Sequence, residues 1–170
     1  MPTISLLHGS TKKFSCFEKT EDARFDTGQH ILGFYFTDDQ DTAESYAYLW
    51  PREIADILGI DEDDVTEDDI ETENSNIDHF LYTAEIAYSS MKTYDYDPYS
   101  LMSKIEEMQL DFNEGNFNKF LDSIKSEGHD LIEFKTADGY SEYVVLNKDQ
   151  ISITDCKILS AKLPTPQPTF

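Results

Sequence analysis

Apolar and polar residues alternate in several short runs of this chain, a pattern that is typical of half-buried β-strands. The clearest run is HFLYTAEIA at residues 79–87. Shorter runs rich in β-branched and aromatic residues predict further strands. These runs lie at residues 3–7, 34–37, 130–134, 143–146 and 151–153. The chain is therefore predicted to be rich in strands.

Other segments carry apolar residues at the spacing of a helix face. The best of them, residues 116–127, is followed by Gly128 as a C-terminal stop. Its apolar face consists of Phe117, Phe120, Leu121 and Ile124. Weaker helical patterns lie at 42–49, 52–58 and 99–110, whereas the Tyr- and Asp-rich residues 88–98 predict a loop. Helices between strands, without the glycine-rich fingerprint of a Rossmann unit, predict a mixed α+β fold.

One segment has almost no apolar residues. Nine of the thirteen residues from 61 to 73 are acidic. Such a run predicts a solvated loop or a locally disordered insert, which we place at about residues 61–76. It lacks the spacing and central glycine of a calcium-binding EF-hand loop. We therefore predict a single domain over residues 1–160 with this acidic insert, followed by a proline-rich tail at 161–170.

The charge of the chain limits the kinds of partner it can have. Thirteen Lys and Arg residues stand against thirty-five Asp and Glu residues, which gives a formal net charge of −22. Nucleic-acid phosphate is repelled by such a surface, so the charge favours a basic protein partner or mimicry of a polyanion. Two distant cysteines, Cys16 and Cys156, predict reduced thiols in the cytoplasm and no metal site. No apolar window is long enough to span a membrane, and the N-terminus lacks the pattern of a secretory signal.

Three separated segments carry the candidate chemistry. They are LLHGS at 6–10, GFYFTDDQDTAESYA at 33–47, and SEYVVLNKDQI at 141–151. The third places Glu142 at the start of an apolar strand, where a carboxylate is held rigidly. Taken by itself, Glu142 is an ordinary carboxylate facing water on an edge strand. The two upstream segments change this interpretation, because together the three match one known arrangement.

Three motifs of this chain, in this order, resemble the His-Tyr-Glu class of ADP-ribosyltransferases. They are HGS, GFYFTD followed by AESY, and SEYVV. That class includes diphtheria-type toxins, poly(ADP-ribose) polymerases and small domains of phages and bacteria. The resemblance covers residues 1–47 and roughly 128–155. It implies an ADP-ribosyltransferase-like split β-sheet core with flanking helices, and NAD as co-substrate. The short spacing between the first two motifs is similar to that of the small phage and bacterial members.

The resemblance also implies roles for individual residues. His8 would hydrogen-bond or orient the adenosine-side ribose of NAD, and Gly9 would present its backbone to the nicotinamide carboxamide without an obstructing β-carbon. Tyr35 and Tyr46 would enclose the nicotinamide ring, because aromatic rings stack on a flat, electron-poor partner. Glu142 would hold the 2′-hydroxyl of the nicotinamide-side ribose. The catalytic set implied by the resemblance is thus Glu142, His8 and Tyr35.

The cofactor-binding set adds Ser10, Tyr46 and Ala43 to His8, Gly9 and Tyr35. Ala43 departs from the family pattern, which often has a Ser or Thr there that bonds the carboxamide. Thr42 and Ser45 are the nearby substitutes. The pyrophosphate of NAD needs positive charge, and the local candidates are Lys12, Lys13, Arg24 and Arg52.

This residue set suits cleavage of the nicotinamide–ribose bond. The cleavage generates an oxocarbenium-like centre, and nicotinamide leaves as a neutral molecule, so no strong general acid is needed. A fixed negative charge and rigid placement of ring and ribose are needed instead. The sequence thus predicts a mono-ADP-ribosyltransferase that modifies a macromolecular target, a protein rather than a nucleic acid. The resemblance implies a bacterial or phage toxin, effector or anti-host factor.

Two other functions fit the same residues. One is an acidic, DNA-mimic-like binding or inhibitor protein on a non-catalytic ADP-ribosyltransferase scaffold. The other is an NAD glycohydrolase, in which water takes the place of the acceptor. Besides the macromolecular acceptor, an antitoxin or a basic protein is the kind of partner that we expect.

Overall fold

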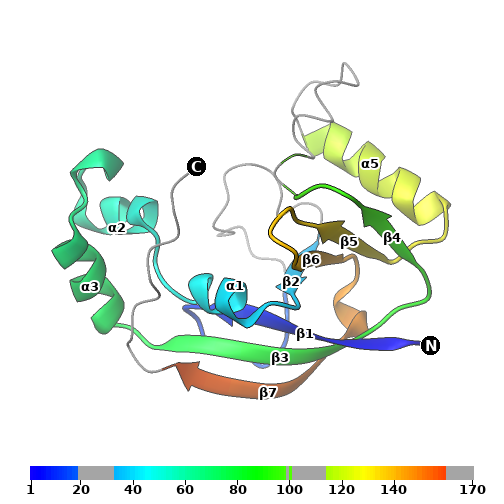
Figure 1. Cartoon of the computed structure of the whole chain (residues 1–170), viewed down its shortest axis with the longest axis horizontal. Helices are drawn as coiled ribbons and strands as arrows, with labels where there is room; N and C mark the ends of the chain where they lie inside the picture. The colour runs from blue at the N-terminus through cyan, green and yellow to red at the C-terminus, as the bar shows by residue number, and fades with distance from the viewer. Residues whose placement is uncertain (19–32, 99, 101–113, 160–170) are drawn as a thin grey trace.

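The computed structural model describes residues 1–18, 33–98, 100 and 114–159 of the 170-residue chain. Within them, seven strands form one mixed sheet in the order β4-β5-β6-β2-β1-β3-β7 (Figure 1). The strands are β1 (Thr3–Ser10), β2 (Phe34–Thr37), β3 (His79–Ala87), β4 (Met91–Tyr94), β5 (Leu131–Lys135), β6 (Ser141–Val145) and β7 (Ile151–Leu159). Only β4 and β5 pair in parallel. The predicted α+β class is confirmed.

The sheet consists of two halves that are joined at one place. In one half, β3 pairs with β1 and β7 over almost its whole length. In the other half, β6 pairs with β2 and β5. The halves meet between β1 and β2, where the only paired residues are Leu7 and Thr37. The fold therefore has the split sheet that the resemblance implied.

Two apolar clusters cover opposite faces of the sheet, because alternate residues of a strand point to opposite faces. Val144 packs with Ile132 and Phe134 beneath Leu121 and Ile124 of helix α5 (Glu114–Ser126). The neighbouring side chains of β6 enter the other cluster, whose buried members are Leu6, Phe17, Phe36, Ala84, Ile86, Leu131, Tyr143 and Val145. The face of β6 that carries Val144 is also the face of Glu142.

Helix α1 (Gln40–Ser45) lies between β2 and the long α2–α3 segment. It starts two residues earlier than predicted, because the Asp39 carboxylate caps it by accepting a hydrogen bond from Thr42 N at 2.7 Å. It ends four residues earlier than predicted. The N–H of Leu49 donates to the side chain of Asn74 at 2.7 Å, and so does not continue the helix.

The prediction for the acidic segment was wrong. Residues 61–73 are not a loop, because they contain η2 (Glu62–Asp64) and most of helix α3 (Glu67–Ser75), which follow helix α2 (Pro51–Leu58). Thr66 begins α3 through a reciprocal capping box: Asp69 N donates to Thr66 Oγ1 at 3.2 Å and Thr66 N donates to Asp69 Oδ2 at 2.9 Å. The Thr-x-x-Asp spacing was the sequence signal for this helix.

Two strand predictions also need correction. Residues 88–98 were predicted to be a loop, but they contain β4, which exists because it pairs in parallel with the distant β5. Strand β7 extends to Leu159 rather than ending near 153, because β3 pairs with it along its length. Apart from Ser100, the predicted helix at 99–110 lies outside the described residues, as do the tail at 161–170 and Arg24.

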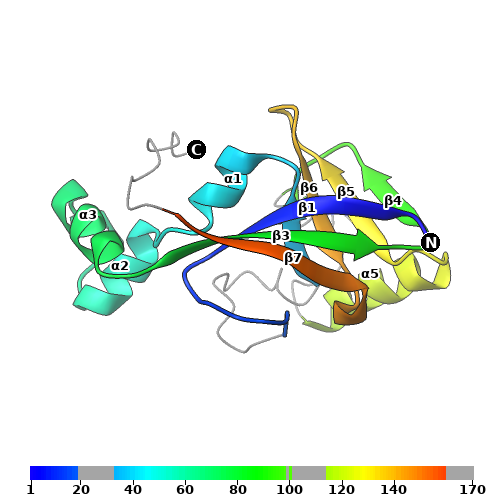
Figure 2. The same cartoon turned by 90° about the horizontal axis from the view of Figure 1, so that it is seen from below.

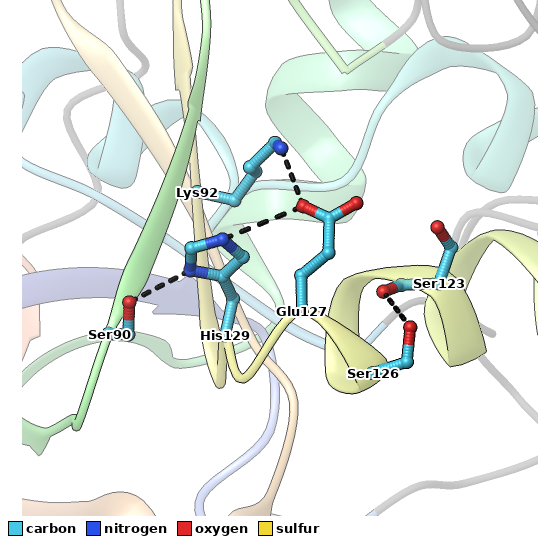
Figure 3. A network of polar contacts seen from close by, with 6 residues as sticks. All are labelled: Ser90, Lys92, Ser123, Ser126, Glu127 and His129. Atoms are coloured by element: carbon cyan, nitrogen blue, oxygen red, sulfur yellow. Dashed lines mark hydrogen bonds and ion pairs between the residues drawn. The ribbon is translucent and has the colours of Figure 1, made fainter.

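A polar network joins α5 to the edge of the sheet (Figure 3). Lys92 Nζ of β4 lies 2.7 Å from Glu127 Oε2, and His129 Nε2 lies 3.7 Å from the same oxygen. The other ring nitrogen of His129 lies 2.9 Å from Ser90 Oγ. The N–H of Ser90 donates to the Asp130 carboxylate at 3.1 Å. These contacts tie β4 to the end of α5.

No helix in the described ranges is both long and apolar enough to cross a bilayer. Both cysteines are free and exposed.

Candidate active site

The three sequence motifs occupy three neighbouring strands, β6, β2 and β1. Glu142 of β6 pairs with Thr37 of β2, and Thr37 pairs in turn with Leu7 of β1. His8 and Gly9 follow Leu7 directly. Segments more than a hundred residues apart in the chain thus meet at the junction of the two halves of the sheet, and α1 lies over this junction.

The Glu142 side chain is buried, with only 5% of the residue exposed. Strand β6 lies between β5 and β2, so the sequence alternative of a water-facing carboxylate on an edge strand is wrong. The pKa of Glu142 is raised from its ordinary value to about 7. Burial is the largest cause of this rise, and the nearby charge of Asp97 is the second. A hydrogen bond from Tyr46 opposes both effects.

Tyr46 connects this carboxylate to α1. It is the C-cap residue of α1, and its hydroxyl donates to Glu142 Oε1 at 3.5 Å. Its ring stacks on Trp50, with ring centroids 5.5 Å apart and an angle of 26° between the ring planes. The indole N–H of Trp50 donates to the carbonyl oxygen of Ser45 at 3.3 Å. An aromatic wall held by the end of α1 therefore flanks the carboxylate.

Ser141, the residue before Glu142, is held by four hydrogen bonds. Its N–H donates to Asp38 Oδ1 at 2.8 Å, and its hydroxyl donates to Glu133 Oε1 at 3.0 Å. Its carbonyl oxygen accepts from Thr37 Oγ1 at 2.9 Å and from Asp38 N at 3.4 Å. The start of β6, and with it the backbone of Glu142, is thereby fixed to β2 and β5. Rigid placement of this kind is what a catalytic carboxylate needs.

His8 lies on the opposite face of the sheet from Glu142. Its ring contacts Phe17 and Phe36, which belong to the apolar cluster on that other face, at centroid distances of 5.0 and 5.6 Å. Its Nδ1 lies 2.8 Å from the carbonyl oxygen of Tyr35, so it donates a hydrogen bond from β1 to β2. The imidazole therefore joins the two halves of the sheet and orients the backbone of Tyr35.

Gly9 faces α1. A β-carbon at this position would lie 1.9 Å from the carbonyl oxygen of Ala43 and 2.6 Å from the N of Ala47. Both alanines are completely buried. The sequence interpretation gave the ligand as the reason for a glycine here, whereas in the structure the close approach of α1 already requires it. The methyl side chain of Ala43 is buried and offers no hydrogen bond.

The remaining predicted residues lie nearby but play different parts. The half-buried side chain of Tyr35 packs against the cluster beneath α5. Ser10 Oγ accepts a hydrogen bond from Lys12 N at 3.0 Å at the end of β1. Thr42 is buried and hydrogen-bonds the hydroxyl of Tyr140, which lies near Glu142 and whose pKa is raised by burial and by the charge of Glu142.

Sequence reasoning missed several residues of this site. Trp50 follows Tyr46 by four residues, and this spacing was a usable signal. Asp38 follows the strand motif directly, but the sequence interpretation gave it no part in the site. Asp97 gave no signal, because only the pairing of β4 with β5 brings the segment after β4 to the side of the sheet where Glu142 lies.

The donor set has the chemistry that NAD requires. A buried carboxylate can face a cationic ribose, and aromatic rings can stack on nicotinamide. Glu142, Tyr35 and Tyr46 are the residues that would hold it. Among the described residues, no group of three or more His, Cys, Asp or Glu side chains is placed to hold a metal ion.

Comparison with known proteins supports the same family. No curated protein matches the chain significantly. A family model described as ADP-ribosyltransferase in polyvalent proteins matches residues 2–157, which include all three motifs, strands β1 to β6 and most of β7. A match over most of the chain, together with the split sheet, shows that this protein belongs to the ADP-ribosyltransferase family found in polyvalent proteins.

Proposed function

We propose that this ADP-ribosyltransferase uses NAD to attach a single ADP-ribose unit to a macromolecular acceptor, a protein rather than a nucleic acid. The observation that carries the proposal is the buried carboxylate of Glu142, held on a central strand beside Tyr46. Burying a carboxylate costs stability, and a buried carboxylate with a raised pKa is therefore a candidate functional group. The task proposed here is to stabilise the positive charge that develops on ribose.

Bound NAD supplies a ribose C1′ whose bond to nicotinamide breaks, with both electrons leaving on neutral nicotinamide. The ionised Glu142 faces the charge that develops at C1′ and accepts a hydrogen bond from the 2′-hydroxyl. Tyr46 and Tyr35 position the nicotinamide ring. A nucleophile of the acceptor forms the new bond to C1′, and its proton passes to the Glu142 carboxylate and then to solvent. The fixed backbone of Ser141 keeps Glu142 in place throughout.

The role of His8 in this proposal is to position rather than to react. Its hydrogen bond to the carbonyl oxygen of Tyr35 sets the spacing of β1 and β2 at the split of the sheet. The net charge of −22 supports a basic protein as the acceptor, since it repels nucleic-acid phosphate. A role as a bacterial or phage toxin or effector in the cytoplasm completes the proposal, and it rests on the resemblance to the small members of the family.

Release of nicotinamide from NAD tests the proposal directly. The full chain is expected to release nicotinamide, and Glu142→Gln, which keeps the shape but removes the charge, is expected to lose at least about a hundredfold in kcat. The exposed Glu85→Gln on β3 is the matched control and should retain full activity. Mass spectrometry of proteins from a cell lysate incubated with labelled NAD then identifies the acceptor.

The outcomes also separate the rival functions. Release of nicotinamide without transfer to any lysate protein would indicate an NAD glycohydrolase. The remaining alternative is an acidic binding protein on a non-catalytic scaffold. It would be indicated if the wild-type protein releases no nicotinamide and the biological effect of the protein persists in Glu142→Gln.

A further inference from the structure

The segment formed by α2, η2 and α3, residues 51–76, projects from the body of the molecule; we refer to it as the acidic arm. Figures 1 and 2 show α2 and α3 together at the end of the molecule opposite α5, beyond the strands. Within the arm, α2 packs against η2 and α3. The arm is a small helical unit that presents most of its surface outward.

An apolar stripe of α2 runs out of the core and onto the surface. Ile54 is completely buried, whereas Ile57 and Leu58, one helical turn later on the same side, are 57% and 40% exposed. Gly59 adopts a left-handed conformation with φ of 69° and ends the helix, and Ile60 beyond it is 41% exposed. Three large aliphatic side chains within four residues of sequence are thus exposed at the end of α2, and we call them the apolar ridge. Such a patch marks an interaction surface more often than an isolated exposed residue does.

The arm that carries this ridge is rich in carboxylates. Residues 51–76 contain eleven Asp and Glu residues and one Arg, a net charge of 1 − 11 = −10 out of the −22 of the whole chain. Eight of these acidic residues are exposed: Asp56, Asp61, Glu62, Asp63, Asp64, Glu67, Asp68 and Glu71. Like charges at this density repel one another and cost stability until a cation neutralises them. An apolar ridge with an acidic rim is complementary to an apolar face flanked by Lys and Arg.

The arm is anchored directly to the candidate active site. The Asn74 side chain accepts from Leu49 N at 2.7 Å and donates to Leu49 O at 3.2 Å. The ring nitrogens of the buried His79 lie 2.8 Å from the carbonyl oxygen of Ala47 and 2.7 Å from that of Asn74. Ala47 follows Tyr46, and Trp50, which stacks on Tyr46, is the N-cap residue of α2. A partner held on the arm is therefore held at a fixed position relative to Glu142.

We propose that the ridge of Ile57, Leu58 and Ile60 with its acidic rim is a docking surface for a cationic amphipathic helix of a protein partner. If the proposed transferase activity is correct, this partner is the protein acceptor, and the arm brings it to the active site. Recognition of an amphipathic helix uses apolar anchors for affinity and charged flanks for association rate and specificity.

Fluorescence anisotropy with three labelled peptides tests the docking surface. The first is an amphipathic Leu/Lys helix of about 18 residues, which is five helical turns. The second replaces Leu by Ser, and the third replaces Lys by Glu. The full chain should bind the first most tightly, and added salt should weaken this binding. Equal binding of the first and second peptides would overturn the proposal, because charge alone would then explain it.

Two variants and a matched control locate the binding. Ile57→Ser/Ile60→Ser and Asp61→Asn/Asp63→Asn/Asp64→Asn should each weaken binding of the first peptide about tenfold or more. Glu85→Gln/Asp122→Asn/Asp149→Asn removes three exposed carboxylates elsewhere and should leave it unchanged. Thermal unfolding verifies that each variant is folded. An equal loss in the control variant, or a wild-type dimer that Ile57→Ser/Ile60→Ser dissociates, would overturn the proposal.

Nicotinamide release from NAD alone, measured on the same proteins, keeps the two proposals separate. Ile57→Ser/Ile60→Ser should release nicotinamide at the wild-type rate, because the ridge lies outside the residues around Glu142. If the wild-type protein releases no nicotinamide, the transferase function is rejected. The peptide-binding measurement still tests the docking surface on the arm.

Discussion

The carboxylate of Asp38 accepts a hydrogen bond from the backbone N–H of Ser141 at 2.8 Å, across 103 residues of sequence. Its second oxygen lies 3.4 Å from the hydroxyl of Tyr143, the residue on the other side of Glu142. One side chain thus contacts both sequence neighbours of the candidate catalytic residue. Asp38 is in this sense a positioning residue for Glu142.

Replacing Asp38 should therefore affect catalysis more than substrate binding. Asp38→Ala removes the acceptor for Ser141 N–H, and we expect kcat for nicotinamide release to fall about tenfold to a hundredfold with a smaller change in KM. Asp38→Asn keeps an acceptor oxygen and should retain most of the activity. Steady-state kinetics check this, with the exposed Asp41→Ala in α1 as control. An unchanged kcat in folded Asp38→Ala would contradict the positioning role.

The pH dependence of the reaction should follow the ionisation of Glu142. Its pKa in the ligand-free protein is about 7, and the proposed mechanism needs the carboxylate form, so kcat/KM should rise from about pH 6 to about pH 8. Asp97→Asn removes a charge that raises this pKa and should move the profile to lower pH. Tyr46→Phe removes a hydrogen bond that lowers it and should move the profile to higher pH. Shifts in the same direction for the two variants would contradict this account of the site.

Glu142 should also make the fold less stable as pH rises. Its folded-state pKa of about 7 lies above the ordinary value of 4.5, so the stability that it contributes is present below about pH 4.5 and is lost as pH rises through 7. The Gln side chain of Glu142→Gln does not titrate. The free energy of unfolding of this variant, relative to that of the wild type, should therefore increase between these pH values, by at most about 3 kcal/mol. Urea unfolding at about pH 5 and about pH 8 measures the difference. A stability difference between variant and wild type that does not change with pH would refute this prediction.

Gly9→Ala should damage both stability and activity. The added β-carbon would meet the backbone at Ala43 and Ala47, which cannot move without moving α1 and Tyr46. We expect a loss of about 2 kcal/mol or more in the free energy of unfolding and a reduced kcat. Ser5→Ala, an exposed change on the same strand, is the control. Wild-type stability in Gly9→Ala would show that α1 is not held against β1 as described.

Local pattern was sufficient where an element depends mainly on its own residues. The strands at 34–37 and 79–87 have their predicted bounds, because alternation and β-branched content specify them directly. The apolar face of α5 was recognised through Leu121 and Ile124, which are buried as predicted. Helix α3 was not predicted because its segment is so acidic, although its capping box is recognisable in the sequence.

Strand pairing and burial depend on contacts between distant segments, and local sequence patterns do not predict these contacts. Strand β4 forms only because β5 lies beside it, and the polar residues of β7 are strand because β3 pairs with them. The hydrogen bonds of Asp38 and the influence of Asp97 on Glu142 arise in the same way.

The sequence by itself determined the family motifs, the α+β class and the choice of Glu142 as the central residue. Only the tertiary structure decided that Glu142 is buried on a central strand, that His8 lies on the opposite sheet face, and that the acidic segment forms a helical arm. The physical reason is that a motif specifies which groups are present, whereas burial, charge and distance at a site are set by segments that meet only in the folded chain.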